Sequence, residues 1–394
     1  MNKYIVFAIF GCLFIMTSFS QTKNIEELLH QIAQNNTELK GFQSFVESQQ
    51  LENKSTNNLP DPQLSGYYLP FGENTTEAYS EYQISQSFEF PTVYAARNKW
   101  NALKADQLQT VVTKKRQEIL LKAKEGFINL YILQKQRSIE VNRKKLSKQV
   151  YEQMQELFNK EQVGILDLNK AKVAWIQEQF VVAQLQTEIQ NQITMLQTLN
   201  GNQSLELDNL QLEIPFELQT FETIWSEKLE SDPKLLELQA NEASALQNVK
   251  LEKNKVLPNL ALGYNYQGIN GDNYSGLYGG LSIPLWSSKN KVKAAQANHE
   301  YQQSNSQVVK QLLHAAVQQE YLQYQLLFKK FTEYQNTIEN LHSEDLLFKA
   351  YSLGEYSFLE YHMEMQFYRN ATDKMLQMEK ELQLLQAQLL IHQL

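Results

Sequence analysis

The chain has 394 residues, of which 36 are lysine or arginine and 44 are aspartate or glutamate, so its formal net charge is −8. This acidic balance, without a basic cluster, argues against nucleic acid as a partner. The single cysteine excludes an intramolecular disulfide, and after the N-terminal segment no stretch approaches the ~20 consecutive apolar residues of a membrane-spanning helix.

Residues 1–20 are expected to be a cleaved secretory signal. Lys3 precedes a short apolar run, and the small residues Ser18 and Ser20 stand where a signal peptidase cleaves. The apolar run is too short to cross a bilayer. Because Cys12 lies inside this segment and not at its end, we expect no lipid anchor and no thiol chemistry in the mature protein.

The rest of the chain repeats one unit twice. Pro62 and Tyr82 in the first half have counterparts at the same spacing in Pro258 and Tyr278. In each half a pair of short alternating segments is followed by a long stretch free of proline. The expected boundaries are 21–200 for the first repeat, 201–222 for a linker and 223–394 for the second repeat. Such duplication favours walls, tubes or arrays over a single off-centre catalytic cleft.

Four segments show the alternation of apolar and polar residues that is typical of β-strands. They lie at about 63–71, 79–90, 259–268 and 275–285. Each is close to the ~9 to 11 residues with which a tilted strand crosses hydrocarbon, and their aromatic content suits the girdles of a membrane barrel. Since the smallest membrane barrels have about eight strands, two or three copies would have to combine. The alternative is a pair of water-soluble hairpins, although no other strand-like segment completes a soluble sheet.

Long helices are expected beside each strand pair. A helix over 93–158 would be on the order of 100 Å long, so its stability must come from side-by-side packing. The helical pattern breaks near 161–167 and 354–360, which predicts two helix-to-helix turns far from the strands. Apolar residues at spacings of three and four, with one step of seven in the first repeat, predict coiled-coil seams. These are Ala171, Trp175, Val182, Leu185 and Ile189 in the first repeat and Met375, Met378, Leu382, Leu385 and Leu389 in the second.

Short motifs flank the strand segments and the second turn. They are LPDPQL at 59–64, ISQSFEFP at 84–91, VLPNL at 256–260, GLSIPL at 280–285 and AYSLGEYSFLE at 350–360. In this order they resemble the motifs of the TolC-like outer-membrane efflux proteins, and the first is similar to the heavy-metal cation efflux branch. The resemblance implies a mainly α fold with membrane β: a homotrimer in which duplicated helix-strand-strand-helix units form a twelve-stranded β-barrel, continued by a long α-helical coiled-coil tunnel.

The same resemblance implies passive export. The protein would be the outer-membrane exit duct of a tripartite efflux system in a Gram-negative-type bacterium, with its helical part in the periplasm. Its partners would be a periplasmic adaptor, an inner-membrane pump of RND type or another type, and outer-membrane lipid; its cargo would be small molecules or metal cations. No enzyme activity and no cofactor are expected, because the sequence carries no zinc-protease, nucleophile-elbow or phosphate-loop motif. The alternative is a soluble periplasmic coiled-coil scaffold or adaptor.

Acidic residues at the two turns are the candidate gate. Glu360 and Asp167 match the position of a carboxylate ring in the family, and Glu364 is a third candidate because Met363 stands where the family often has a second acid. In a trimer each position would appear three times around the axis and favour cations. The alternative is an ordinary acid in the first turn of a helix, where the helix dipole favours negative charge.

The exposed tips of the two turns are the candidate adaptor contacts. They are Gly354, Glu355, Ser357 and Gly164, for which simple turn chemistry is the alternative. A soft-metal site at His362 and nearby methionines is not expected, because methionine is a common gap filler in helical seams.

Overall fold

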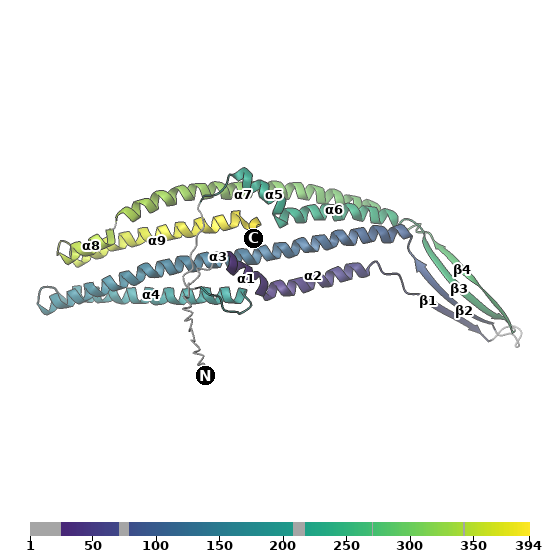
Figure 1. Cartoon of the computed structure of the whole chain (residues 1–394), viewed down its shortest axis with the longest axis horizontal. Helices are drawn as coiled ribbons and strands as arrows, with labels where there is room; N and C mark the ends of the chain where they lie inside the picture. The colour runs from purple at the N-terminus through teal and green to yellow at the C-terminus, as the bar shows by residue number, and fades with distance from the viewer. Residues whose placement is uncertain (1–24, 71–78, 208–216, 270, 342) are drawn as a thin grey trace, which may run out of the picture.

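The computed structural model describes residues 25–70, 79–207, 217–269, 271–341 and 343–394. The expected signal segment 1–20 and residues 208–216 of the expected linker lie outside the described residues. The molecule is elongated, with a sheet at one end and two helical turns at the other (Figure 1).

The sheet has four antiparallel strands in the order β1-β2-β3-β4. The strands are β1 Gln63–Leu69, β2 Tyr79–Phe88, β3 Asn259–Ile269 and β4 Asp272–Ser282. The two hairpins, one from each repeat, join through β2 and β3, which pair from Tyr79 opposite Ile269 to Phe88 opposite Leu260. Gly263 makes this approach possible, because a Cβ there would lie 2.3 Å from the carbonyl oxygen of Ile84.

Three strands end earlier than the alternation predicts. β1 ends at Leu69, whereas its expected range was 63–71. β2 stops at Phe88 and not at residue 90, because Phe90 is the N-cap of the next helix and Pro91 begins it. The fourth strand was expected at 275–285, but β4 runs from Asp272 to Ser282. Pro284 has no amide hydrogen to continue the ladder, which places the strand end before it.

The helices form two long hairpins with shorter helices beside them (Figure 1). The first repeat contains α1 Ile25–Asn35, α2 Thr37–Ser55, α3 Pro91–Asn159 and α4 Ile165–Leu199. The second contains α5 Phe221–Ser231, α6 Pro233–Asn254, α7 Lys291–Leu341, α8 Ser343–Ser352, α9 Phe358–Leu389 and the 3₁₀ turn η1 Ile391–Gln393. Within the described ranges, none of the helices is both long and apolar enough to cross a membrane.

The long helices pack against one another along their apolar seams. α3 packs against α4, α6 and α9, while α7 packs against α6 and α9. Leu382 and Leu389 of the α9 seam are fully buried in a cluster with Tyr324 and Phe331 of α7. The α9 seam therefore holds α9 against α7 within the second hairpin, whereas α3 joins the two hairpins through α9. The two turns at the hairpin ends share one apolar cluster.

Candidate functional site: the sheet face and the helical tip

One face of the sheet is apolar and bare. Leu64, Ile84, Tyr264 and Leu277 stand directly opposite one another, one on each strand from β1 to β4. Leu277 is 93% exposed and Leu64 is 79% exposed. An apolar row across a whole sheet is costly in water, so this face requires a covering of lipid or protein.

The opposite face carries polar side chains. Because neighbouring residues of a strand point to opposite faces, the adjoining row consists of Ser65, Gln83, Asn265 and Gly276. On the same face the amide of Asn265 donates a hydrogen bond of 2.6 Å to the carboxylate of Glu81. Apolar residues on one face and polar residues on the other match the lipid-facing and lumen-facing sides of a membrane barrel.

The sheet does not close on itself. β1 and β4 each pair on one side only, so both are edge strands of the described sheet. Unpaired edges invite pairing with another chain. Combined with the apolar face, they are suited to joining further copies.

At the far end of the molecule, the turn between α8 and α9 is built by two local devices. Gly354 has φ of 78°, a left-handed conformation that suits glycine, and a Cβ there would meet no atom within 4 Å. Ser357 and Glu360 form a reciprocal capping box at the start of α9. The hydroxyl and the backbone amide of Ser357 donate to the Glu360 carboxylate over 2.7 and 2.9 Å. Glu360 therefore has a structural role of its own.

The capping box also affects the charge of Glu360. Hydrogen bonds from the Ser357 side chain, and then from its backbone, lower the pKa of the Glu360 carboxyl. Because the pKa of Glu360 is lower in the folded state, its ionised carboxylate stabilises the fold at pH values above the usual carboxyl range. This stabilisation is lost as the pH falls through the folded pKa. Glu360 is thus ionised and exposed at neutral pH, as both a cap and a charged ring would require.

The turn between α3 and α4 places the other predicted residues. Gly164 is exposed and is the N-cap of α4. Asp167 lies in the first turn of α4 and pairs with Lys170 over 3.2 Å, both side chains being about half exposed. Glu355 at the other turn and Glu364 on α9 are exposed.

The two turns belong to one packed tip. Leu168 and Tyr361, which directly follow Asp167 and Glu360, are buried in the same cluster with Tyr351. Beside it an apolar groove of about 450 Å³ runs between α4 and α9, lined among others by Leu166, Val173 and Leu359. The described residues contain no group of three or more His, Cys, Asp or Glu side chains that could hold a metal ion.

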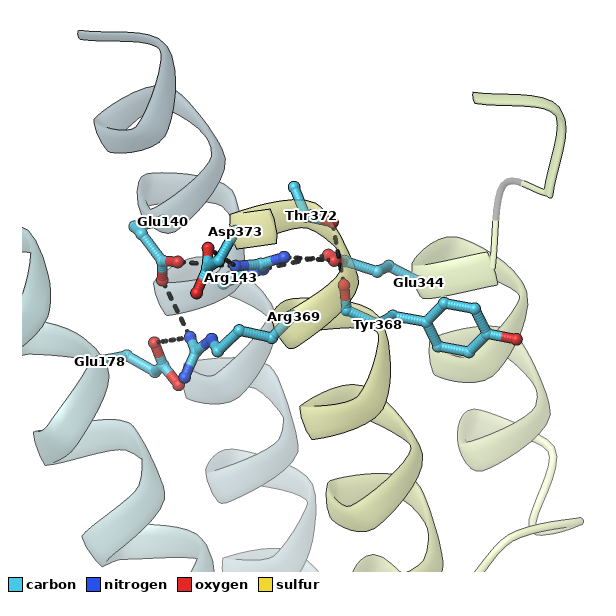
Figure 2. Close-up of polar contacts among 8 residues, drawn as sticks. All are labelled: Glu140, Arg143, Glu178, Glu344, Tyr368, Arg369, Thr372 and Asp373. Carbon is cyan, nitrogen blue, oxygen red and sulfur yellow. Dashed lines mark hydrogen bonds and ion pairs between the residues drawn. The ribbon is translucent and has the colours of Figure 1, made fainter. Parts of the chain in front are cut away.

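A buried ion network, not expected from the sequence, lies deeper in the helical body (Figure 2). It joins two arginines and four carboxylates from four helices: Glu140 and Arg143 of α3, Glu178 of α4, Glu344 of α8, and Arg369 and Asp373 of α9. Arg143, whose side chain is only 3% exposed, contacts Glu140 and Glu344 over 2.6 Å each. Arg369 bridges Glu140, over 2.9 Å, and Glu178. The network ties α8 to α3, α4 and α9.

The arginines are charged in spite of their burial. Burial by itself lowers the pKa of Arg143, but the hydrogen bonds and charges of Glu344 and Glu140 outweigh it and the pKa is raised. For Asp373, burial is the main cause that raises the pKa of the carboxyl. A buried pair of this kind is costly to break from one side, because the remaining charge then has no partner.

One signal in the sequence pointed to this network. The seam of α4 steps from Ala171 and Trp175 to Val182, and Glu178 occupies the seam position between them. An acid in an apolar seam requires a cation opposite it, and here that cation is Arg369. The helix that carries the partner of Glu178 could not be identified from the sequence alone.

The comparisons with known proteins agree with this arrangement. Residues 224–344 match the family described as outer membrane efflux protein. The resemblance to the outer-membrane efflux family is confirmed. No curated protein matches the chain.

Solved channels of this kind share the fold. CusC superposes with a TM-score of 0.73 at 16% identity, covering 93% of this chain and 91% of its own. The outer membrane channel CmeC of Campylobacter jejuni gives 0.68 at 15% identity, with 94% and 85% covered. The outer membrane protein VceC of Vibrio cholerae gives 0.66 at 13% identity, with 94% of each chain covered. The expectation of a mainly helical efflux-protein fold with a small antiparallel sheet is therefore confirmed.

Proposed function

We propose that this protein is the outer-membrane exit duct of a tripartite efflux system, through which small molecules or metal cations leave passively. Three copies place their four-stranded sheets edge to edge in one barrel, and their helices continue it as a periplasmic tunnel. The protein itself carries out no chemistry, and an inner-membrane pump supplies the energy.

One observation carries this proposal: the row of Leu64, Ile84, Tyr264 and Leu277 crosses all four strands on one face, while the other face is polar. A soluble scaffold would cover such a row with its own helices. Here the sheet extends beyond the helical body (Figure 1), so lipid is the covering that fits it. The open edges at β1 and β4 supply the contacts between copies.

The helical tip is the proposed docking end for a periplasmic adaptor. Gly354, Glu355 and Ser357 lie on one turn and Gly164 on the other, all of them exposed. Support comes from the apolar groove beside them, which a helical partner can fill.

The test of the duct is fractionation followed by a mass measurement. We expect the full-length protein in the outer-membrane fraction, and native mass spectrometry in detergent to show a trimer that dissociates on heating. A monomer recovered from the soluble periplasm would instead support the scaffold alternative.

We further propose that Glu360 and Asp167, with Glu364 as a third candidate, form a cation-favouring constriction. Replacing Glu360 and Asp167 together, as Glu360→Gln and Asp167→Asn, is expected to raise single-channel conductance in planar bilayers and to weaken block by divalent cations several-fold. Glutamine still fits the capping position of residue 360, so the variant changes charge more than structure.

Ser357→Ala is the matched control for this experiment. It removes the cap, at a cost of about 1 kcal/mol, but leaves the Glu360 carboxylate in place. Currents unchanged in the charge variant would remove the gate assignment, and an equal effect of Ser357→Ala would assign the change to the lost cap.

A further inference from the structure

The turn between β4 and α7 presents bare apolar side chains next to the sheet. Ile283, Leu285 and Trp286 are all exposed, Trp286 by 81%. Their positions are fixed by the backbone: the amide of Leu285 donates to the carbonyl of Ile283 over 2.9 Å, and the amide of Lys289 donates to that of Trp286 over 3.1 Å. The turn is therefore an ordered segment that projects from the end of the sheet, and its exposed tryptophan requires an explanation.

The equivalent place in the first repeat is built differently. There Pro91 follows β2 and begins α3 at once, whereas α7 begins only at Lys291, well after Pro284. Phe90 packs in a small buried cluster with Val93 and Leu251. The apolar projection thus belongs to the second repeat only and is not a requirement of the strand-to-helix junction.

Positive charge accompanies the apolar residues. Lys289, Lys291 and Lys293 follow Trp286 closely, and the sequence has no acidic residue from 273 to 299. All three lysines are exposed, and within the described part of the chain they form no ion pair. Lys291 and Lys293 lie in the first turn of α7, where the helix dipole disfavours positive charge. Their placement does not serve helix stability.

We propose that the segment 283–293 binds the anionic phospholipid surface of the membrane at the helix end of the sheet. Trp286, with Ile283 and Leu285, lies at the boundary between head groups and acyl chains, as tryptophan does at membrane interfaces. The lysines lie against lipid phosphates. This inference rests on the proposed function, because it requires the sheet to lie in a bilayer.

The test compares labels at two depths. The only cysteine is Cys12, so a Cys12→Ser background accepts a single fluorescent label at Trp286→Cys or, as a control, at Leu277→Cys in the middle of β4. The full-length protein is placed in nanodiscs that contain nitroxide-labelled phosphatidylglycerol or nitroxide-labelled phosphatidylcholine. Quenching then reports which head group lies near each label.

We expect both labels to be quenched, and the label at 286 to show at least a fivefold preference for phosphatidylglycerol, the contribution of about one lysine at an anionic surface. The triple variant Lys289→Gln, Lys291→Gln, Lys293→Gln should reduce that preference to about one. The label at 277 should show no preference in either background.

Quenching at 277 without quenching at 286 would overturn the inference and leave the duct intact, as would cross-linking of position 286 to a second copy. Quenching at 286 without a head-group preference would also overturn it. No quenching at either position would contradict the proposed duct itself.

Discussion

Replacing Leu277 with arginine is expected to prevent assembly of the proposed trimer in the outer membrane. Leu277 lies in the middle of β4 and is the most exposed residue of the apolar row, at 93%. An arginine on the lipid face near the bilayer midplane costs about 2 to 4 kcal/mol, which corresponds to roughly 30-fold to 1,000-fold in the assembly equilibrium. The amount of heat-dissociable trimer in outer-membrane fractions measures this loss.

Gly276→Arg supplies the control for this prediction. Gly276 is the adjacent residue of the same strand and lies in the polar row opposite Asn265, and a Cβ added there would meet no atom within 4 Å. In the proposed barrel the same charge there would face the lumen, so the trimer should form at nearly the wild-type level. If both variants assemble equally well, the apolar face does not touch lipid; if both fail equally, the effect belongs to the strand and not to its face.

Replacing Arg143 with methionine is expected to lower the free energy of unfolding by about 3 to 5 kcal/mol. Glu344 would lose its hydrogen bonds to Arg143, and Glu140 would keep only Arg369. Both carboxylates would remain between packed helices with too little positive charge around them (Figure 2). Chemical denaturation of the detergent-solubilised protein, followed by far-UV circular dichroism, measures the difference.

Lys148→Met on the same helix is the matched control. Lys148 pairs with Glu152 over 3.3 Å, but both side chains are more than half exposed, so its loss should change the free energy of unfolding by less than about 1 kcal/mol. The two substitutions remove the same charge from α3 and differ in burial.

The pH dependence of the Arg143→Met variant gives a second readout. An unpaired buried carboxyl has a pKa raised above its unfolded value, so the folded state takes up a proton more readily than the unfolded state and gains stability as the pH falls. The deficit relative to wild type should therefore be smaller at pH 5 than at pH 7.5. A deficit that is small and the same at both values would show that the network contributes little.

The elements that depend on local rules were predicted well. The alternation in 79–90 and 259–268 identified strands because side chains in a strand change face at every residue. Pro91 begins α3, two residues before the expected helix start at 93, and Pro284 follows the end of β4. The strand ends were placed too late because the residues next to each proline were treated as strand. The seam from Met375 to Leu389 identified the buried face of α9.

The tip illustrates a partial success. The turn at 354–360 was expected from the break in the helical pattern, and its glycine, cap and acid occur in the order that a helix start requires. The capping box accounts for Glu360 without any gate, and a single chain brings no carboxylate ring together. The gate therefore stays a prediction for the trimer.

The sequence by itself determined the duplicated plan, the periods of the helices and strands, and the chemistry of each strand face, because these depend on residues close together in the chain. Only the tertiary structure decided which residues from distant segments meet: the join of β2 to β3, the row from Leu64 to Leu277, and the network that links Arg143 to Glu344. These contacts depend on how whole helices and hairpins pack. The charges of the network become important because packing buries them, and the apolar row exists only once the four strands are paired.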